Sequence, residues 1–299
     1  MPGNFSNVIK GYLDSPKFKK LSESAQYGYR HHLKLAEVVM GSLPVEVVRP
    51  AIIQGYLDGL ADFPGKQINA KTALKAVERW ALVRDLLPYP ITTGTETVKS
   101  DDGHEPWTDK EVQDAIEGAR PDIARAVLLA ATTGQRGSDI VKMRWSDVEE
   151  RNGRYGINVI QKKTKVRLFV PFTHDFSAKV AKWEKTPPFF LVLAPDGRQF
   201  TRNRLSHDWN DERTNNPALK SHKDRELVLH GLRATAVVRL NTQGATTLEI
   251  SSIVGMSEAL VSRYCRLANK NKMAMMAMER IDNVKTLQAK LLKSNDPTL

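Results

Sequence analysis

The chain has 299 residues, about twice the length of a typical single domain, so we expect two domains, each with its own hydrophobic core. Its hydrophobic fraction of 41% and charged fraction of 26% are typical of a globular protein and exclude a fibre or a largely disordered chain. The formal net charge of +11 favours a polyanionic partner such as nucleic acid, although charge alone agrees equally well with a solvated basic surface.

The single cysteine, Cys265, excludes an intrachain disulfide and a cluster of thiolate metal ligands. The N-terminal segment MPGNFSNVIKGYLDS lacks the apolar stretch of a signal peptide, and no apolar run approaches the ~20 residues that cross a bilayer. These features fit a reducing compartment, so we expect a cytoplasmic protein.

Three segments in the first third of the chain have the periodicity of amphipathic helices. The first runs from Leu21 to Met40 with Ser22 as its N-cap, the second from Val45 to Leu60, and the third from Asn69 to Leu87. Pro64-Gly65 is expected to stop any helix between the last two. The pattern predicts a small all-α domain of three to four short helices.

Basic side chains recur every four residues on one face of the third segment. Leu74 and Val77 lie on its apolar face, whereas Lys71, Lys75 and Arg79 lie on another. In isolation such a basic stripe is more typical of a solvated face. The motifs farther along the chain make these three residues candidate phosphate contacts of a nucleic acid.

The stretch LPYPITTGTETVKSDDGHEP is rich in Pro, Thr, Ser and Gly and lacks apolar periodicity. This composition predicts an exposed connection between domains. We therefore expect residues 1–98 to form the N-terminal all-α domain with its linker, and residues 99–299 to form the C-terminal domain.

The second domain is predicted to be mainly α-helical around a small antiparallel β-sheet, an α+β fold. Thr108 is a predicted N-cap, and Pro121 is expected to open the next helix. After Asp147 the residues NGRYGINVIQKKTKVRLFVPF combine turn residues with alternating apolar positions, which indicates a basic β-hairpin. Helical periodicity returns at Phe176, is interrupted by FFLVLAPDGRQF, and continues from His230.

Three motifs carry residues capable of phosphoryl-transfer chemistry. Arg136 follows a Thr-Gly turn at the predicted start of a helix, with Asp139 three residues later. His230 and Arg233 are three residues apart, so a helix places both on the same side. Tyr264 follows a glycine-containing break and a short helical stretch. Each motif alone is more typical of packing or of a surface ion pair, and their order along the chain is what indicates a function.

This ordered set resembles the catalytic pattern of the tyrosine recombinase (phage integrase) family. TGQRGSDIVKMRWSDV is similar to the box around the family's first arginine, HGLRATAV to its second box, and RYCR to the segment with its nucleophilic tyrosine. The resemblance implies catalytic roles for Arg136, His230, Arg233 and Tyr264. It covers essentially the whole catalytic half, whereas the N-terminal domain resembles the family's core-DNA-binding (SAM-like) domain more loosely.

Two positions of the family pattern are less clear in this chain. KKTKVRLFVP resembles the family's β-hairpin and places Lys163 at the catalytic lysine, with Lys162 and Lys165 as alternatives. The family usually has His or Trp after the glycine that precedes the tyrosine helix, where this chain has Met256. Either Met256 fills the space without donating a hydrogen bond, or Ser257 supplies the donor, or the protein is an inactive member.

These residue types suit phosphodiester cleavage. Two arginines offer planar, permanently charged donors to the non-bridging oxygens, where charge develops in the transition state. A histidine with a pKa near neutrality can accept the tyrosine proton, and a hairpin lysine can protonate the leaving 5′ oxygen. The implied 3′-phosphotyrosyl product can be religated by a 5′ hydroxyl, so the scheme requires no metal, ATP or other cofactor. No Walker-type GxxxxGK[ST] motif occurs in the sequence.

The resemblance also implies partners. These are double-stranded DNA with specific recombination sites, a homotetramer assembled on it, and an accessory DNA-bending protein. The segment after Tyr264 predicts one or two amphipathic helices with a Met-rich stripe, which pack within one subunit or contact a neighbouring protomer. The alternatives are a non-catalytic DNA-binding or regulatory protein, and a type IB topoisomerase. The separate N-terminal domain favours the recombinase of a phage or mobile element.

Overall fold

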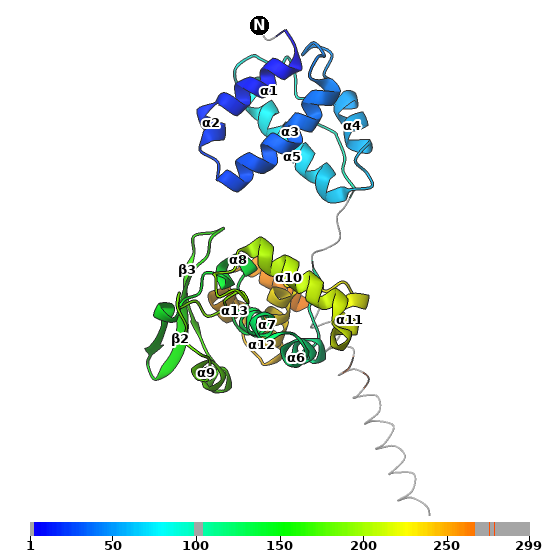
Figure 1. The fold of residues 1–299 in the computed structure, drawn as a ribbon. Helices are drawn as coiled ribbons and strands as arrows, with labels where there is room; N and C mark the ends of the chain where they lie inside the picture. The colour runs from blue at the N-terminus through cyan, green and yellow to red at the C-terminus, as the bar shows by residue number, and fades with distance from the viewer. Residues whose placement is uncertain (1–2, 99–103, 267–274, 276–277, 279–299) are drawn as a thin grey trace, which may run out of the picture. The chain divides into compact units, whose positions relative to one another are not determined.

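The computed structural model describes residues 3–98, 104–266, 275 and 278. The chain divides into two compact units, Met1–Gly103 and His104–Leu299, and each has its own hydrophobic core (Figure 1). The predicted fold class is confirmed, because the described residues are mainly helical and contain one small antiparallel sheet.

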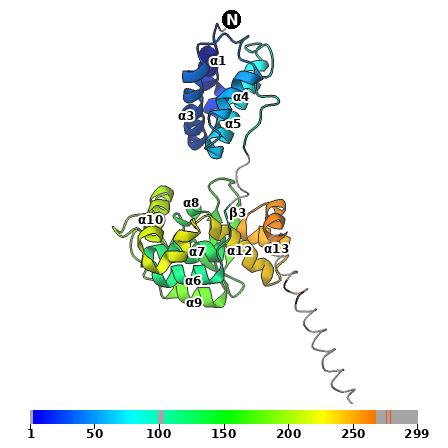
Figure 2. The same cartoon turned by 90° about the vertical axis from the view of Figure 1, so that its right-hand side faces the viewer.

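The first unit consists of helices packed around one core. They are α1 (Phe5–Asp14), α2 (Pro16–Lys19), α3 (Glu23–Met40), α4 (Pro50–Asp58) and α5 (Pro64–Leu82). Helix α3 packs along α5, and α1 contacts both of them (Figure 2). The predicted N-cap is confirmed, since the Ser22 hydroxyl accepts a hydrogen bond from the Ala25 N–H at 3.4 Å. Helix α5, which carries the basic stripe, buries its opposite face in this core.

Two expectations for this unit are wrong, and one helix was missed. Pro64 opens α5 instead of stopping a helix, because proline at the first helical position loses no hydrogen bond. Helix α4 begins at Pro50 for the same reason, not at Val45. Helix α1 was not predicted, although the buried residues Phe5, Val8, Ile9 and Tyr12 have the spacing of a helix face.

In the second unit, one group of helices precedes the three-stranded sheet in the chain and a second group follows it. In chain order its elements are α6 (Asp109–Gly118), α7 (Pro121–Thr133), α8 (Gly137–Ile140), η1 (Trp145–Asp147), β1 (Val148–Arg151), β2 (Arg154–Ile160), β3 (Arg167–Pro171), α9 (His174–Ala181), α10 (Arg202–Asn215), η2 (Pro217–Leu219), α11 (Lys220–Asp224), α12 (Gly231–Thr242) and α13 (Thr247–Val254). A further helical stretch covers residues 258–266.

Local signals predicted the start of this unit correctly. Thr108 caps α6 through a capping box with Glu111, and Pro121 occupies the first turn of α7. The predicted helices beyond Tyr264 lie outside the described residues, except that Met275 and Met278 are helical and exposed.

The sheet has the strand order β1-β2-β3, with both pairs antiparallel. Ile157 pairs with Val170, and both are buried in the core. The last register pair of β2 and β3 is Ile160 with Arg167, so residues 161–166 form the hairpin loop. Helix α12 packs between α7 and α13, and α13 also contacts β3 (Figure 2). This packing brings the start of α12 close to the C-terminal ends of α7 and α13.

Candidate active site

The turn between α7 and α8 positions Arg136. Gly134 ends α7 with a left-handed φ of 63°, and a Cβ atom there would lie 2.7 Å from the Val254 side chain. Only glycine fits this turn without strain or collision. Arg136 follows as the half-buried N-cap residue of α8, and its Nη1 donates to the Gln161 Oε1 at 3.1 Å.

Arg233 lies in the first turn of α12 and is only 3% exposed. Its guanidinium donates to the carbonyl oxygen of Gly134 and, at 3.2 Å, to that of Gly255. Burial first, and then the charge of Arg136, lower the pKa of Arg233 to about 10, while Asp139 and Tyr264 act in the opposite direction. The guanidinium is still charged at neutral pH, and these interactions place all four residues near one another.

His230 is the N-cap residue of α12, with one side open to solvent. Its ring contacts that of His104 in an edge-on arrangement, with the centroids 5.2 Å apart. Burial of the ring first, and then the charges of His104, Arg233, Arg136 and Arg202 in that order of size, lower the pKa of His230 to about 4. The expected pKa near neutrality is therefore wrong, and the imidazole is neutral at pH 7.

Tyr264 lies in the helical stretch 258–266 and is half-buried. It packs against a small apolar cluster that includes Val261 and Cys265. Its electrostatic effect on Arg233 shows that the phenol group is near that guanidinium. The structure thus brings together Arg136, His230, Arg233 and Tyr264, which come from widely separated parts of the chain.

Lys163 is not brought into this cluster by any contact between described side chains. It lies exposed in the loop between β2 and β3, as do Lys162 and Lys165. The base of the loop is nevertheless attached beside Arg136, because the Lys162 N–H donates to the Asp139 Oδ1 at 2.8 Å. The other carboxylate oxygen of Asp139 is buried without a hydrogen-bond partner among the described residues.

Residues 108–271 match the phage integrase family, and this match spans more than half of the chain. The chain belongs to this family. The integrase of Escherichia phage HK022 is 30% identical over 120 residues, which are 38% of this chain and 32% of that protein. The match therefore covers about a third of the relative's length.

Two solved structures have the same fold as this chain. A lambda integrase dimer bound to a COC′ core site has a TM-score of 0.74 at 17% identity, covering 88% of this chain and 95% of the other. A lambda integrase tetramer bound to a Holliday junction has a TM-score of 0.72 at 17% identity, covering 87% of this chain and 77% of the other.

Met256, which the sequence resemblance sets at the family's usual His or Trp position, is only 8% exposed. Its side chain belongs to the apolar cluster against which Tyr264 packs, together with Val254 and Val261. Ser257 is exposed, and its carbonyl oxygen accepts from the Val261 N–H at 3.0 Å, within the first turn of the tyrosine helix. Met256 therefore supports the helix that carries Tyr264 through packing.

The predicted stripe on α5 is only partly free in the first unit. Lys75 and Arg79 are exposed. Lys71 is half-buried, and its ammonium group donates to the carbonyl oxygen of Thr95 in the segment after α5. Two of the three side chains are thus open to a ligand, while Lys71 has an intramolecular partner.

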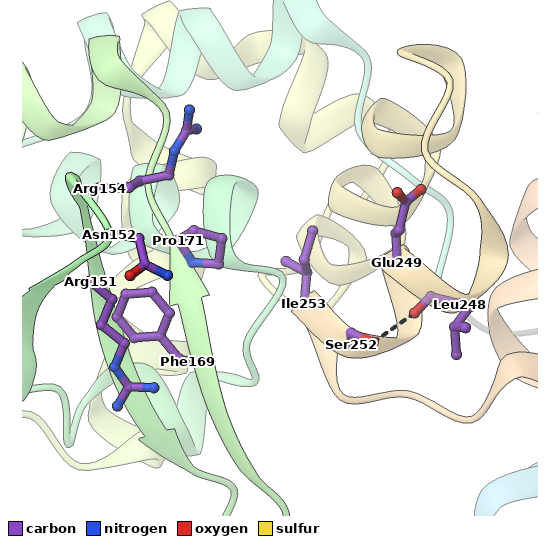
Figure 3. Close-up of a pocket in the computed structure, with 9 residues that line it drawn as sticks. All are labelled: Arg151, Asn152, Arg154, Phe169, Pro171, Leu248, Glu249, Ser252 and Ile253. Carbon is purple, nitrogen blue, oxygen red and sulfur yellow. Dashed lines mark hydrogen bonds between the residues drawn. The ribbon is translucent and has the colours of Figure 1, made fainter.

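An open groove of about 670 Å³ lies between the sheet and α13 (Figure 3). Arg151, Asn152 and Arg154 line one side, and Leu248 and Ser252 line the other. None of the four clustered residues lines this groove. Among the described residues, no group of three or more His, Cys, Asp or Glu could hold a metal ion, and no helix is long and apolar enough to cross a membrane.

Sequence reasoning missed two residues beside the cluster, Gln161 and His104. A usable signal existed for Gln161, because it continues the alternation of the buried residues Ile157 and Val159 and is itself fully buried. No comparable signal existed for His104, which reaches His230 only through the tertiary fold.

Proposed function

We propose that this protein is a site-specific DNA recombinase that cleaves and rejoins DNA strands through a 3′-phosphotyrosyl intermediate. The observation that carries the proposal is the convergence of two arginines, a neutral histidine and a tyrosine at one place in the second unit. Membership of the phage integrase family supports the same chemistry. The reaction would integrate or excise a mobile element.

The two arginines suit the scissile phosphate. The positive charge of the half-buried Arg136 lowers the pKa of the buried Arg233 guanidinium, which is the sign of two cations held close together. A phosphate between them would relieve this repulsion. Positioned donors of this kind stabilise the charge of the pentavalent transition state by a few kcal/mol each, which is about a hundredfold or more in rate.

Tyr264 is the proposed nucleophile. Its oxygen forms a bond to the scissile phosphorus while the bond from phosphorus to the 5′ oxygen breaks. His230, neutral at pH 7, can accept the phenolic proton directly or through water. Lys163 on the exposed hairpin loop can give a proton to the leaving 5′ oxygen. A 5′ hydroxyl then attacks the phosphotyrosine, and the same steps run in reverse.

The proposed substrate is double-stranded DNA with specific recombination sites, bound by four copies of the chain. The lambda integrase tetramer on a Holliday junction supports this stoichiometry through its fold. In this scheme residues 1–98 bind DNA through Lys75 and Arg79, an accessory protein bends the DNA, and residues 99–299 perform the chemistry in the cytoplasm of a prokaryotic host.

The experiment uses DNA fragments that the purified protein selects from sequence flanking its gene. Each is nicked close to the cleavage position, so that the released strand diffuses away and religation fails. Wild-type protein, without added metal, should form a DNA adduct that survives denaturation and maps to Tyr264. Tyr264→Phe should bind the same DNA and form no adduct. An adduct on another tyrosine would overturn the assignment.

A second candidate function is favoured by Met256, which replaces a hydrogen-bond donor of the family pattern with a thioether in an apolar cluster. An inactive family member would still bind DNA as a regulator. Specific binding without any adduct, on nicked substrates of the selected sequence, would favour this function. Relaxation of supercoils without site preference would instead indicate a topoisomerase.

A further inference from the structure

Gln161 is a fully buried glutamine directly after β2, two residues before Lys163. A buried side-chain amide costs free energy unless its donors and acceptors are satisfied. The alternation of β2 would normally place an apolar residue here, as it does at Ile157 and Val159. The site therefore has a polar side chain where the fold alone would favour an apolar one.

All hydrogen-bonding positions of the Gln161 amide are used. Its Oε1 accepts from the Arg136 Nη1 at 3.1 Å and from the Thr164 Oγ1 at 2.7 Å. Its Nε2 donates to the Gln135 Oε1 at 2.8 Å and to the Val254 carbonyl oxygen at 2.9 Å. Two donated and two accepted bonds exhaust the capacity of a primary amide.

The orientation of this amide is fixed by its partners. An arginine has only donors and a backbone carbonyl only accepts, so the oxygen must face Arg136 and the nitrogen must face Val254. Turning the amide over would break both bonds. The Arg136 guanidinium consequently meets an acceptor that is held between the end of α13 and the base of the hairpin loop.

A neutral acceptor also leaves the charge of Arg136 available. A carboxylate in place of the amide would form an ion pair with the guanidinium and compete with a phosphate for it. The amide oxygen orients one N–H and carries no net charge. Buried groups that hold a reacting side chain in one position act by preorganisation rather than by contact with substrate.

We propose that Gln161 is a positioning residue for DNA cleavage, which fixes the Arg136 guanidinium for the scissile phosphate and couples it to the hairpin that carries Lys163. This inference rests on the proposed recombinase function. Gln161 touches no reacting atom and acts through Arg136. Its loss is therefore expected to slow cleavage far more than it weakens DNA binding.

The test compares Gln161→Met with Gln135→Met in the full chain. Methionine keeps the length of the side chain and removes the amide. Gln135 is a matched control, since it is 2% exposed and its amide hydrogen-bonds to Gln161 and to the Thr133 carbonyl oxygen, whereas the Arg136 guanidinium donates to Gln161 and not to the Gln135 amide. Thermal unfolding and DNA affinity are measured first, followed by single-turnover cleavage of the nicked substrate.

We expect Gln161→Met to slow cleavage by about 10- to 100-fold relative to Gln135→Met, because a misplacement of about 1 Å can cost about 100-fold. The same rates are then measured on a substrate with a methylphosphonate at the scissile position. That group lacks the negative charge which Arg136 neutralises, so the difference between the variants should shrink. Equal rates for the two variants, or an undiminished difference on methylphosphonate, would overturn the inference.

A second variant covers the case in which Gln161→Met does not fold. Gln161→Glu keeps the shape of the side chain and places a carboxylate against Arg136. It should slow cleavage of the phosphodiester more than that of the methylphosphonate, whereas a wild-type rate on both would refute the proposal. If the wild-type protein itself forms no adduct, the proposed function fails before Gln161 is tested.

Discussion

The Arg233 Nη2 donates to the carbonyl oxygen of Gly255 at 3.2 Å, and this bond joins the start of α12 to the turn before the tyrosine helix. The same guanidinium donates to the carbonyl oxygen of Gly134, in the turn before Arg136. One buried side chain thus holds the two turns that place a second arginine and the tyrosine. Arg233 therefore has both a structural role in the fold and a role in the proposed chemistry.

Arg233→Ala is expected to destabilise the second unit as well as abolish cleavage. The substitution leaves the buried carbonyl oxygen of Gly134 and the half-buried carbonyl oxygen of Gly255 without their donor. An unsatisfied buried acceptor costs about 1–3 kcal/mol, and the cost is lower for the half-buried one. Urea unfolding should show this loss. Arg239→Ala is the control, because Arg239 lies on the same helix and forms an ion pair with the exposed Asp109, which contributes little. Equal midpoints for the two variants would contradict the role of Arg233.

Gly255→Ala should disturb the site through crowding as well as through backbone strain. Gly255 has a φ of 61°, and a Cβ atom there would lie 2.5 Å from the Gln161 Nε2. We expect a loss of stability of about 1–3 kcal/mol and a larger proportional loss of cleavage rate. Gly197→Ala separates the two effects, since Gly197 has a φ of 76° with nothing within 4 Å of the added atom. A matching phenotype for both variants would mean that crowding at Gln161 has no effect.

The lowered pKa of His230 makes the free energy of unfolding depend on pH. Burial and the surrounding positive groups lower the pKa of His230 from 6.5 to about 4. Between these two values the unfolded chain binds a proton that the folded protein does not, so the free energy of unfolding should decrease as the pH falls through this range. Above pH 6.5 the contribution is fully present. Urea midpoints measured from pH 7 to 4.5 should fall less steeply for His230→Gln.

His207→Gln provides the control for this measurement, because His207 is an exposed histidine on α10. It should retain the steep slope of the wild-type protein. Identical slopes for the wild-type protein and His230→Gln would show that His230 does not contribute. Bound DNA should raise the pKa of His230, because the phosphate charge opposes that of the nearby arginines.

Local signals explain which parts of the fold were predictable. The caps at Ser22 and Thr108 and the proline at Pro121 depend on residues within one helical turn, and the structure contains all three. Pro64 was misread because proline both stops one helix and opens the next. The residues on either side do not distinguish these two uses. Local signals thus predict the start of a helix where they have a single meaning, and they fail at Pro64, where proline has two.

Within the site, only the residues that belong to sequence motifs were predictable. Order along the chain selected Arg136, Arg233 and Tyr264, and the fold brings them together. The role of Gln161 was not predictable, because its bond to the Val254 carbonyl oxygen joins residues 93 positions apart. The low pKa of His230 depends in the same way on burial and on His104, which no motif places beside it.

The basic stripe of α5 should contribute unequally to DNA binding. Lys75 and Arg79 are exposed, whereas Lys71 already donates to the Thr95 carbonyl oxygen. Each phosphate contact contributes about −0.9 to the slope of log affinity against log salt. Lys75→Ala and Arg79→Ala should therefore each flatten the slope by about one unit, and Lys71→Ala should change it less. An unchanged slope for the first two variants would remove the stripe from the DNA interface.

Met256 should tolerate an apolar replacement, because it acts by packing against the cluster on which Tyr264 rests. Met256→Leu nearly conserves volume and is expected to cost less than about 1.5 kcal/mol of stability, with cleavage close to the wild-type rate. Met256→Ala removes most of the buried side chain and should cost about 2–5 kcal/mol. Cleavage on the nicked substrate and urea unfolding measure the two effects. If Met256→Leu folded normally and lost cleavage, the thioether itself would be required, and Met256 would have a chemical role that packing does not supply.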